Sequence, residues 1–192
     1  DWSSDVCSSD LLPPSLPLLL ANSSPVRDWE SFAMGDGPPR PVYGFRGASG
    51  IDGTLSEAFG IAAAAGHAVL LSGDLALLHD SNGWLWGQQG CGRLTVVLLD
   101  NGGGGIFEQL PIRGGEPAAF DFERLFAMGQ PLDQRLLAGC HGVPGRCVSS
   151  LGELAEALPW ALEQPLALLH LRTDRRADAD LRQALRRMAP NP

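Results

Sequence analysis

Short apolar runs alternate along the chain with segments of helical character. The apolar runs are continuous and do not alternate with polar residues, which is typical of strands buried on both faces of a parallel sheet. The chain therefore predicts an α/β fold, a parallel sheet with helices on both faces. The expected strands are Leu16–Ala21, Val42–Phe45, Ala68–Leu71, Leu94–Leu99, Arg146–Ser149 (at an edge) and Leu166–Leu171. The expected helices are Arg27–Phe32, Leu55–Ala65, Leu75–Gly87, Phe120–Met128, Leu132–Gly139, Ser150–Leu162 and Asp178–Met188.

Two of the expected helices begin with the spacing of a capping box. Thr54 is followed three residues later by Glu57, and Ser150 by Glu153. In such a box the hydroxyl accepts a backbone N–H of the first turn. We therefore predict that Thr54 and Ser150 are N-caps, and that Gly66 ends the helix that Thr54 begins.

Composition narrows the class of protein. A chain of 192 residues with 44% hydrophobic residues suits one domain with a sizeable core. A net charge of −8 argues against a nucleic-acid partner. No apolar run approaches the roughly 20 residues of a membrane span. The four cysteines form no C-x-x-C pair, so we expect free thiols, a reducing compartment and a cytoplasmic location.

The start of the chain differs from the rest. The segment 5–11 resembles the translation of a common sequencing adapter, so residues 1–11 are expected to be a non-native or disordered leader. A native disordered tail is the alternative. Residues 12–192 are then expected to form one domain, the carboxyl-terminal part of a larger enzyme.

Polar and glycine-rich residues gather after four of the expected strands, in loops 22–27, 46–53, 73–75 and 100–107. In parallel sheets, ligands bind outside the carboxyl ends of the strands. Asp74 and Asn101, 27 positions later, end two successive strands, and Gly103 could add a backbone carbonyl. Three such oxygens suit Mg²⁺ carrying a diphosphate, and glycine-rich backbone amides could bind the phosphate oxygens. The alternatives are an ordinary strand-to-helix turn and a flexible loop.

These residues resemble the metal–diphosphate motif of thiamine-diphosphate enzymes. Leu75 stands where that motif has its second glycine, and Asp100 where it has its first asparagine, but the ligand positions are kept. Segments 21–28, 46–53 and 101–107 together resemble the 2-succinyl-5-enolpyruvyl-6-hydroxy-3-cyclohexene-1-carboxylate synthases, and 171–178 resembles their cyanobacterial members. The resemblance spans about residues 16–185.

The resemblance implies a decarboxylating carboligase that joins 2-oxoglutarate to isochorismate in menaquinone and phylloquinone synthesis. It implies thiamine diphosphate and Mg²⁺, or Mn²⁺, as cofactors. The metal ligands would be Asp74, Asn101 and Gly103. The remaining cofactor contacts would be Ile51, which bends the cofactor, with Gly73, Leu75 and Gly104. The substrate contacts would be Ser23, Arg27, Arg46, Ile106 and Phe107.

Simpler roles remain open for several of these residues. Arg27 could form a surface pair with Asp28, Arg46 could pair with Asp52, and Ile51 could be ordinary core. His170, inside an apolar strand, is expected to be a packed histidine.

The resemblance places the activating glutamate in an amino-terminal domain, so we expect no catalytic residue in this chain and little activity from it alone. The expected partners are its own amino-terminal domains, in a homodimer or homotetramer. Two other functions stay open: another thiamine-diphosphate decarboxylase or lyase, similar to acetohydroxyacid synthase, and a non-catalytic phosphate-binding module. A small neutral substrate would not need both Arg27 and Arg46.

Overall fold

The computed structural model describes residues 11–33, 39–45, 47, 50–90, 92–114 and 121–188. The expected leader falls almost entirely outside this range, as do Arg46, Cys7 and Cys91. Cys140 and Cys147 are free thiols, as expected. Within the described residues no helix is both long and apolar enough to cross a membrane.

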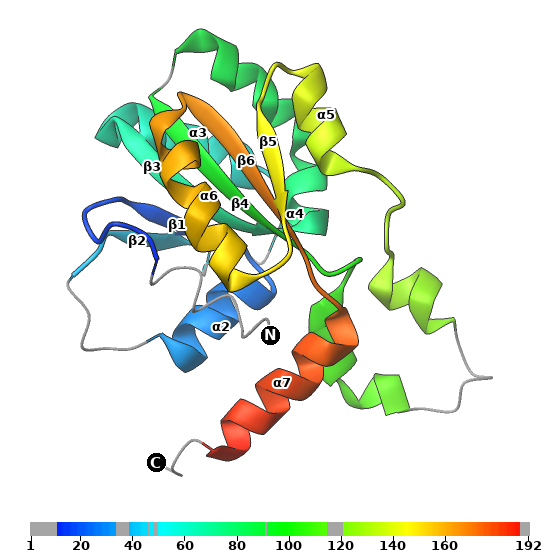
Figure 1. Ribbon diagram of the computed structural model, residues 1–192. Coiled ribbons are helices and arrows are strands. Elements are labelled where there is room, and N and C mark those ends of the chain that lie inside the picture. The colour runs from blue at the N-terminus through cyan, green and yellow to red at the C-terminus, as the bar shows by residue number, and fades with distance from the viewer. Residues whose placement is uncertain are drawn as a thin grey trace.

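A six-stranded sheet in the order β2-β1-β3-β4-β6-β5 forms the centre of the molecule (Figure 1). All five strand pairs are parallel, which confirms the predicted sheet. The strands are β1 (Leu18–Leu20), β2 (Val42–Gly44), β3 (His67–Gly73), β4 (Arg93–Asp100), β5 (Gly145–Val148) and β6 (Leu166–Arg172). β5 is an edge strand, as predicted.

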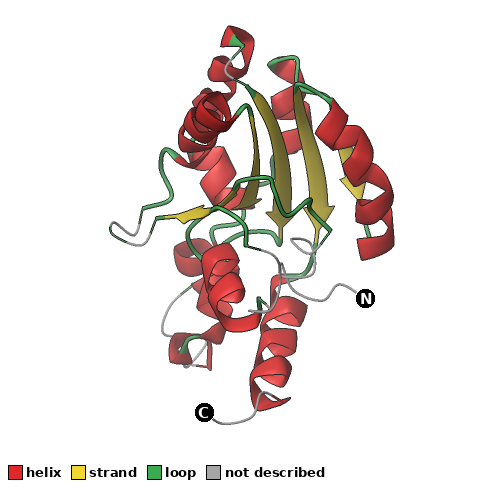
Figure 2. Cartoon of the chain, turned by 90° about the vertical axis from the view of Figure 1, so that its left-hand side faces the viewer, coloured by secondary structure: helices red, strands yellow, loops and turns green. Residues whose placement is uncertain are grey.

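Helices cover both faces of the sheet (Figure 2). Successive residues of a strand point to opposite faces. Leu18 and Leu20 accordingly pack with Leu154 and Leu158 of α6, whereas Leu19 packs with Leu55 and other residues of α3. The continuous apolar character of the strands follows from these two buried faces.

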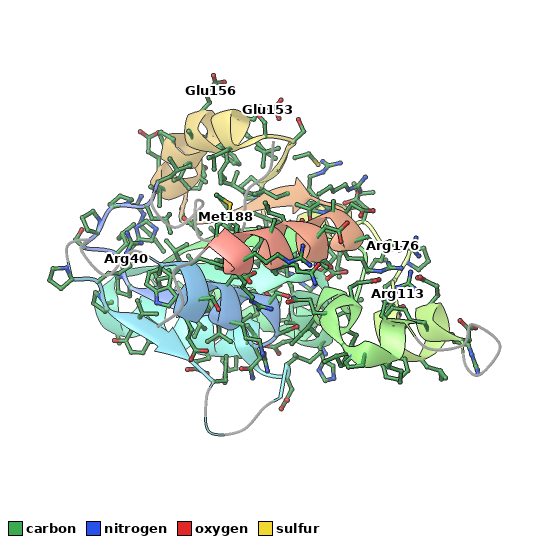
Figure 3. The ribbon with its side chains drawn as sticks, turned by 90° about the horizontal axis from the view of Figure 1, so that it is seen from below. Arg40, Arg113, Glu153, Glu156, Arg176 and Met188 are labelled. Atoms are coloured by element: carbon green, nitrogen blue, oxygen red, sulfur yellow. The ribbon has the colours of Figure 1, made fainter. Side chains whose placement is uncertain are left out.

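The α-helices lie close to their predicted positions. They are α2 (Ser24–Phe32), α3 (Thr54–Ala65), α4 (Asp74–His79), α5 (Gln134–Cys140), α6 (Leu151–Glu163) and α7 (Arg175–Met188). α7 begins three residues before the predicted start. Figure 3 shows Glu153 and Glu156 on the outer side of α6, away from the sheet.

Two of the predicted helices are helical but are not regular α-helices. The predicted helix Leu75–Gly87 is α-helical only to His79 and continues as 3-10 helix over Ser81–Gln89. Gly83 packs there against Leu55, where a Cβ would lie 3.0 Å from the Leu55 Cγ. The predicted helix Phe120–Met128 is a π-helical turn, Glu123–Ala127, in its described part.

Thr54 does not cap α3, contrary to the prediction. Its hydroxyl donates to the Ile51 carbonyl at 3.1 Å, and the N-cap is Gly53. The Asp80 carboxylate instead accepts the Ser56 backbone N–H at 2.7 Å. The Ser150 cap is confirmed, because its hydroxyl accepts the Glu153 N–H at 3.1 Å.

The strand order reverses direction at β1. The chain moves from β1 to β2 on one side, then returns past β1 to place β3 on the other side. Crevices at such switch points are the usual ligand sites of open α/β sheets. The carboxyl ends of the strands point toward the end of the molecule where α2 and α7 lie (Figures 1 and 2).

Candidate functional site

A cavity of about 350 Å³ lies at the carboxyl ends of β1, β3 and β4. Loops that are far apart in the sequence converge on it, as the strand pattern predicted. Every described residue of the predicted site lines it: Ser23, Arg27, Ile51, Gly73, Asp74, Leu75, Asn101, Gly103, Gly104, Ile106 and Phe107. Arg46 lies outside the described residues, and its role stays a prediction.

Asp74 presents a buried carboxylate at the end of β3. Only 6% of the residue is exposed. Burial, and then the charge of Asp100, raise the pKa of Asp74 to about 7, although backbone N–H groups of Leu75, Asp74 and Gly103 oppose the rise. A carboxyl group held in this state would gain from a nearby cation, which favours the charged form. The hydrogen bond from the Gly103 N–H also brings the loop that follows β4 (residues 101–104, the β4 loop) directly against Asp74.

Asn101 carries an unsatisfied oxygen. Its Oδ1 is buried and has no hydrogen-bond partner among the described residues. Its side chain forms a hydrogen bond with Asp178 of α7. Because a buried polar atom without a partner is costly, Oδ1 is a good candidate for contact with a bound cation.

The described residues contain no group of three or more His, Cys, Asp and Glu side chains that could hold a metal ion. A cation at Asp74 would therefore depend on neutral oxygens and on the ligand for the rest of its coordination. Mg²⁺ binds in this way, through one or two carboxylates together with substrate phosphates. A Cβ built at Gly73 would meet no atom within 4 Å, so the backbone there is open to a ligand.

The β4 loop is packed from behind by the segment 121–129. Gly103 has φ +128°, and a Cβ there would lie 2.2 Å from the Ala127 carbonyl oxygen. A Cβ at Gly104 would lie 2.4 Å from the Phe126 carbonyl oxygen. These two glycines let the loop pass close to its neighbour while it faces the cavity.

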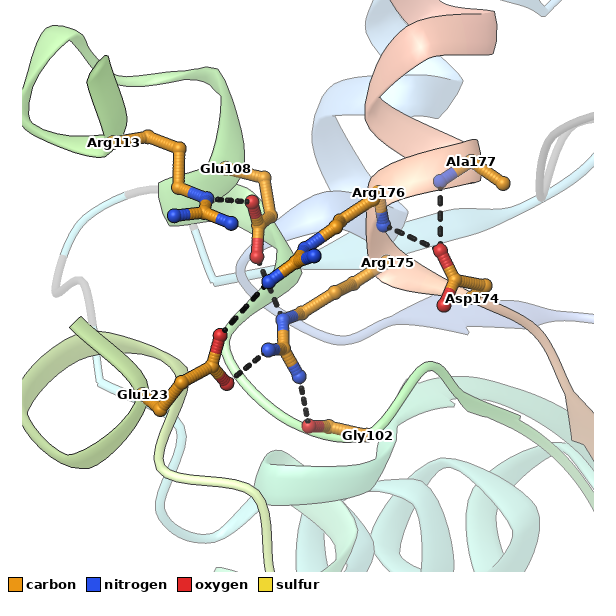
Figure 4. Close-up of polar contacts among 8 residues, drawn as sticks. All are labelled: Gly102, Glu108, Arg113, Glu123, Asp174, Arg175, Arg176 and Ala177. Atoms are coloured by element: carbon orange, nitrogen blue, oxygen red, sulfur yellow. Dashed lines mark hydrogen bonds and ion pairs between the residues drawn. The ribbon is translucent and has the colours of Figure 1, made fainter.

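Arg175 fixes the same loop from the start of α7 (Figure 4). Its guanidinium donates to the Gly102 carbonyl at 3.0 Å and to Glu108 at 2.7 Å, and it also pairs with Glu123. The Glu108 side chain is only 3% exposed, and it also accepts a hydrogen bond from a second arginine, Arg113. This charged network joins the β4 loop to α7.

Two non-glycine residues in the described part of the chain have positive φ, and both line the cavity. Ser23 has φ 79° and Met128 has φ 50°. Backbone strain of this kind is concentrated at functional sites, where surrounding contacts hold it in place. The Ser23 carbonyl accepts a hydrogen bond from Arg27 at 2.8 Å.

Arg27 does not form the surface pair with Asp28 that was the simpler alternative. Asp28 is 1% exposed and forms an ion pair with Arg182 of α7. The Arg182 Nε lies 2.8 Å from Oδ1 and 2.9 Å from Oδ2 of Asp28, and the Arg182 Nη2 lies 2.6 Å from Oδ2. Arg27 is exposed at the rim of the cavity. Its guanidinium is thus placed where a carboxylate ligand could reach it.

Asp100, which replaces an asparagine of the family motif, bonds to His170. His170 is fully buried, as predicted, and its Nε2 lies 2.7 Å from Asp100 Oδ2. Burial would raise the pKa of Asp100, but hydrogen bonds from His170 and the Gly102 N–H hold it below its ordinary value. The extra carboxylate is thereby kept charged next to the site.

Sequence reasoning missed Met128 and two cavity residues of α7, Asp178 and Arg182. The signal for the α7 residues was the spacing of Arg175, Asp178 and Arg182, which share one face of a helix. The predicted helix began at Asp178 and so left out Arg175, and this shared face was not recognised.

Comparisons with known proteins agree with this architecture. No protein-family model matches the chain. The chain is 55% identical over 184 residues to the 2-succinyl-5-enolpyruvyl-6-hydroxy-3-cyclohexene-1-carboxylate synthase of Synechococcus sp. (strain CC9902), covering 95% of the chain and 32% of that protein. The synthase of Parasynechococcus marenigrum (strain WH8102) is 56% identical over 182 residues, with coverage of 94% and 32%.

Solved structures share the fold. A benzoylformate decarboxylase from Polynucleobacter necessarius has a TM-score of 0.68 at 20% identity, covering 88% of this chain and 32% of that one. A thiamine diphosphate-dependent 4-hydroxybenzoylformate decarboxylase from Rhodococcus jostii RHA1 has a TM-score of 0.64 at 17% identity, covering 90% and 33%. The chain spans about a third of the length of the curated relatives it matches. Over nearly all of its own length the chain is similar to 2-succinyl-5-enolpyruvyl-6-hydroxy-3-cyclohexene-1-carboxylate synthases, and the matched region makes up about a third of each of those proteins.

Proposed function

We propose that this chain is the metal- and diphosphate-binding part of a thiamine-diphosphate-dependent carboligase that joins 2-oxoglutarate to isochorismate with loss of CO₂. The name shared by the similar proteins supports this activity. The observation in the structure that supports it best is the unsatisfied Asn101 Oδ1 on the same cavity as the buried Asp74 carboxylate.

The residues present fit the cofactor. Asp74, Asn101 and the Gly103 carbonyl would hold Mg²⁺ or Mn²⁺, and the diphosphate would lie against Leu75 and Gly104 on the cavity wall. Gly73 leaves room for the phosphate oxygens. Ile51, half-buried on the cavity, would press against the cofactor and set its shape. Bound thiamine diphosphate supplies the electron sink for decarboxylation; the protein orients the substrates and excludes water.

Both proposed substrates carry carboxylates. Arg27 lies at the cavity rim and, with Ser23, would hold one of them, because a planar guanidinium binds carboxylate through two hydrogen bonds. Arg46 would be the second cation. Ile106 and the Phe107 ring, which meets Phe126 edge-on at 5.7 Å, would form the apolar wall. The homo-oligomer, the amino-terminal partner domains and a cytoplasmic location remain predictions.

Calorimetry with thiamine diphosphate and Mg²⁺ tests the proposed site. We expect the chain to bind the cofactor only when Mg²⁺ is present. Asp74→Ala should weaken cofactor binding by more than about 100-fold, because the loss of a group that only hydrogen-bonds to a metal ligand already weakens metal binding by about 10–100-fold. Asp180→Ala, at an exposed position on α7, is the control and should bind as the parent does.

Equal binding by Asp74→Ala and the parent would contradict the metal site. It would favour the non-catalytic phosphate-binding module, which needs no Asp74. Substrate specificity requires a second assay with the amino-terminal domains supplied. There, Arg27→Gln should raise the KM for a dicarboxylic substrate more than that for pyruvate.

A further inference from the structure

One face of α7 contacts two elements that border the site, the loop after β4 and helix α2. Arg175, Asp178 and Arg182 lie at positions i, i+3 and i+7 of the helix and therefore share a face. Arg175 binds the Gly102 carbonyl, Asp178 binds the Asn101 side chain, and Arg182 binds Asp28 of α2. Helix α7 thus holds both the β4 loop and helix α2, which carries Arg27.

The contact between Asp178 and Asn101 determines which way the carboxamide faces. Chemistry assigns its direction, because a charged carboxylate only accepts hydrogen bonds and the amide must therefore donate through Nδ2. Oδ1 is then turned away from Asp178, and it is the buried atom without a partner among the described residues. Asp178 is itself held by the Thr173 hydroxyl, which donates to it at 2.7 Å.

A rotated carboxamide would not bind a cation. If Asn101 turned by half a rotation about its terminal bond, its NH₂ group would take the place of Oδ1 and present two hydrogens to the metal. The rotation would also set Oδ1 against the Asp178 carboxylate, so that two acceptors faced each other. Groups behind a metal ligand commonly fix its orientation by such hydrogen bonds.

We propose that Asp178 is a positioning residue for the metal: it orients the Asn101 carboxamide so that Oδ1 faces the divalent cation. This inference rests on the proposed function, because it assumes that a cation binds between Asp74 and Asn101. Asp178 does not touch the metal. Its whole effect on cation affinity passes through Asn101, apart from its charge.

The test is calorimetric titration of Mg²⁺ into the chain with excess thiamine diphosphate. Asp178→Asn should weaken Mg²⁺ binding by about 10–100-fold, since an asparagine at 178 can stabilise either orientation of Asn101. Asp180→Asn removes the same charge from an exposed position on the same helix and should leave the affinity unchanged. Saturating Mg²⁺ should restore cofactor binding by Asp178→Asn, which it would not do for a misfolded site.

A second background separates orientation from charge. In Asn101→Asp the ligand has two equivalent oxygens, so its rotation no longer matters. There the further change Asp178→Asn should not weaken Mg²⁺ binding. A loss of the same size in both backgrounds would overturn the proposal, because it would show that only the charge of Asp178 acts.

Thr173→Val provides a milder variant should Asp178→Asn fold poorly. It removes one support of the Asp178 carboxylate and should weaken Mg²⁺ binding in the same direction but less. Unchanged affinity in a folded Asp178→Asn chain overturns this inference alone, provided that Asp74→Ala has lost binding. Absence of Mg²⁺-dependent binding in the parent overturns the inference together with the proposed function.

Discussion

At Gly103 the loop after β4 has no room for a side chain. A Cβ there would lie 2.2 Å from the Ala127 carbonyl oxygen, and the backbone has φ +128°. Gly103→Ala must therefore displace the loop from Asp74. We expect cofactor binding to fall by at least about tenfold while the sheet stays folded, as judged by calorimetry and circular dichroism; a loss of 1.4 kcal/mol is already tenfold.

Gly102→Ala is the matched control for this prediction. Gly102 also has a positive φ, +77°, but a Cβ there would come no closer than 3.9 Å to the Arg175 Nη1. The substitution should cost about 1–2 kcal/mol of backbone strain and have a much smaller effect on the cofactor. Equal losses at both positions would show that backbone strain, and not the contact with Ala127, controls the loop.

Some residues of the site could be predicted from the chain and others could not. Asp74 and Asn101 follow apolar strands, and parallel strands end at one edge of a sheet, so their convergence on one cavity could be expected. Asp178 lies on a helix whose docking position no local pattern reveals. The orientation of the Asn101 amide depends on that docking, so this orientation could not be predicted from the sequence.

Among the helices, the link between α2 and α7 offers a sharp test of stability. Asp28 and Arg182 form a bidentate ion pair with side chains that are 2% and 3% exposed. Removing one partner leaves a buried charge unpaired, so Asp28→Ala should lower the free energy of unfolding by about 3–5 kcal/mol. Urea denaturation measures the loss. Asp28→Leu combined with Arg182→Met should cost less than Asp28→Ala alone, since it leaves no uncompensated charge.

The cap of α5 predicts a pH dependence. Asp133 accepts the backbone N–H groups of Arg135 and Leu136 at 2.9 and 3.1 Å. Burial opposes ionisation of Asp133, but these bonds and nearby Arg135 hold its pKa below the ordinary value of 3.8. A lowered folded-state pKa stabilises the fold above the unfolded pKa, and this stabilisation is lost as the pH falls through the folded-state pKa.

Asp133→Asn keeps a capping side chain but cannot ionise. We therefore expect the parent to be the more stable of the two at neutral pH, and the difference to shrink below pH 3.8 as Asp133 takes up its proton. Urea denaturation at pH values from neutral to below 3.8 measures this difference in the free energy of unfolding. Asp180→Asn, at an exposed position, should show no such trend. A difference that does not change with pH would contradict the assignment to Asp133.

Two capping sequences with the same spacing behave differently. Ser150 caps α6, whereas Thr54 does not cap α3. The difference comes from Asp80, which reaches the first turn of α3 from the end of α4 and accepts the Ser56 N–H. Helix positions were predictable from local patterns, but a cap supplied by another element was not.

Across the molecule, several large apolar side chains remain open to solvent. Tyr43, Leu85, Trp86 and Leu136 are 45%, 56%, 46% and 60% exposed. Exposed apolar area favours association. We expect the chain alone to self-associate at high concentration in sedimentation velocity, and Trp86→Lys to reduce this. A sedimentation coefficient that does not change with concentration would contradict the expectation.

The fold class was predictable, but the strand order was not. Continuous apolar strands between helices indicate a parallel sheet. Nothing in the pattern shows that the chain passes over β1 between β2 and β3, or that β6 lies between β4 and β5. That order decides which strand ends surround the cavity, so the sequence predicted the members of the site better than their arrangement.

The partners of Arg175 and Arg182 lie much earlier in the chain than the arginines themselves, and this separation affects the order in which the contacts can form during translation. Gly102 lies 73 residues before Arg175, and Asp28 lies 154 residues before Arg182. A ribosome delivers the earlier partners first, at about 5–20 residues per second. For several seconds the nascent polypeptide holds the loop after β4 without the helix that contacts it. Cofactor capture would then follow translation of α7, and a ribosome stalled before that point would carry the loop after β4 without its contact to Arg175.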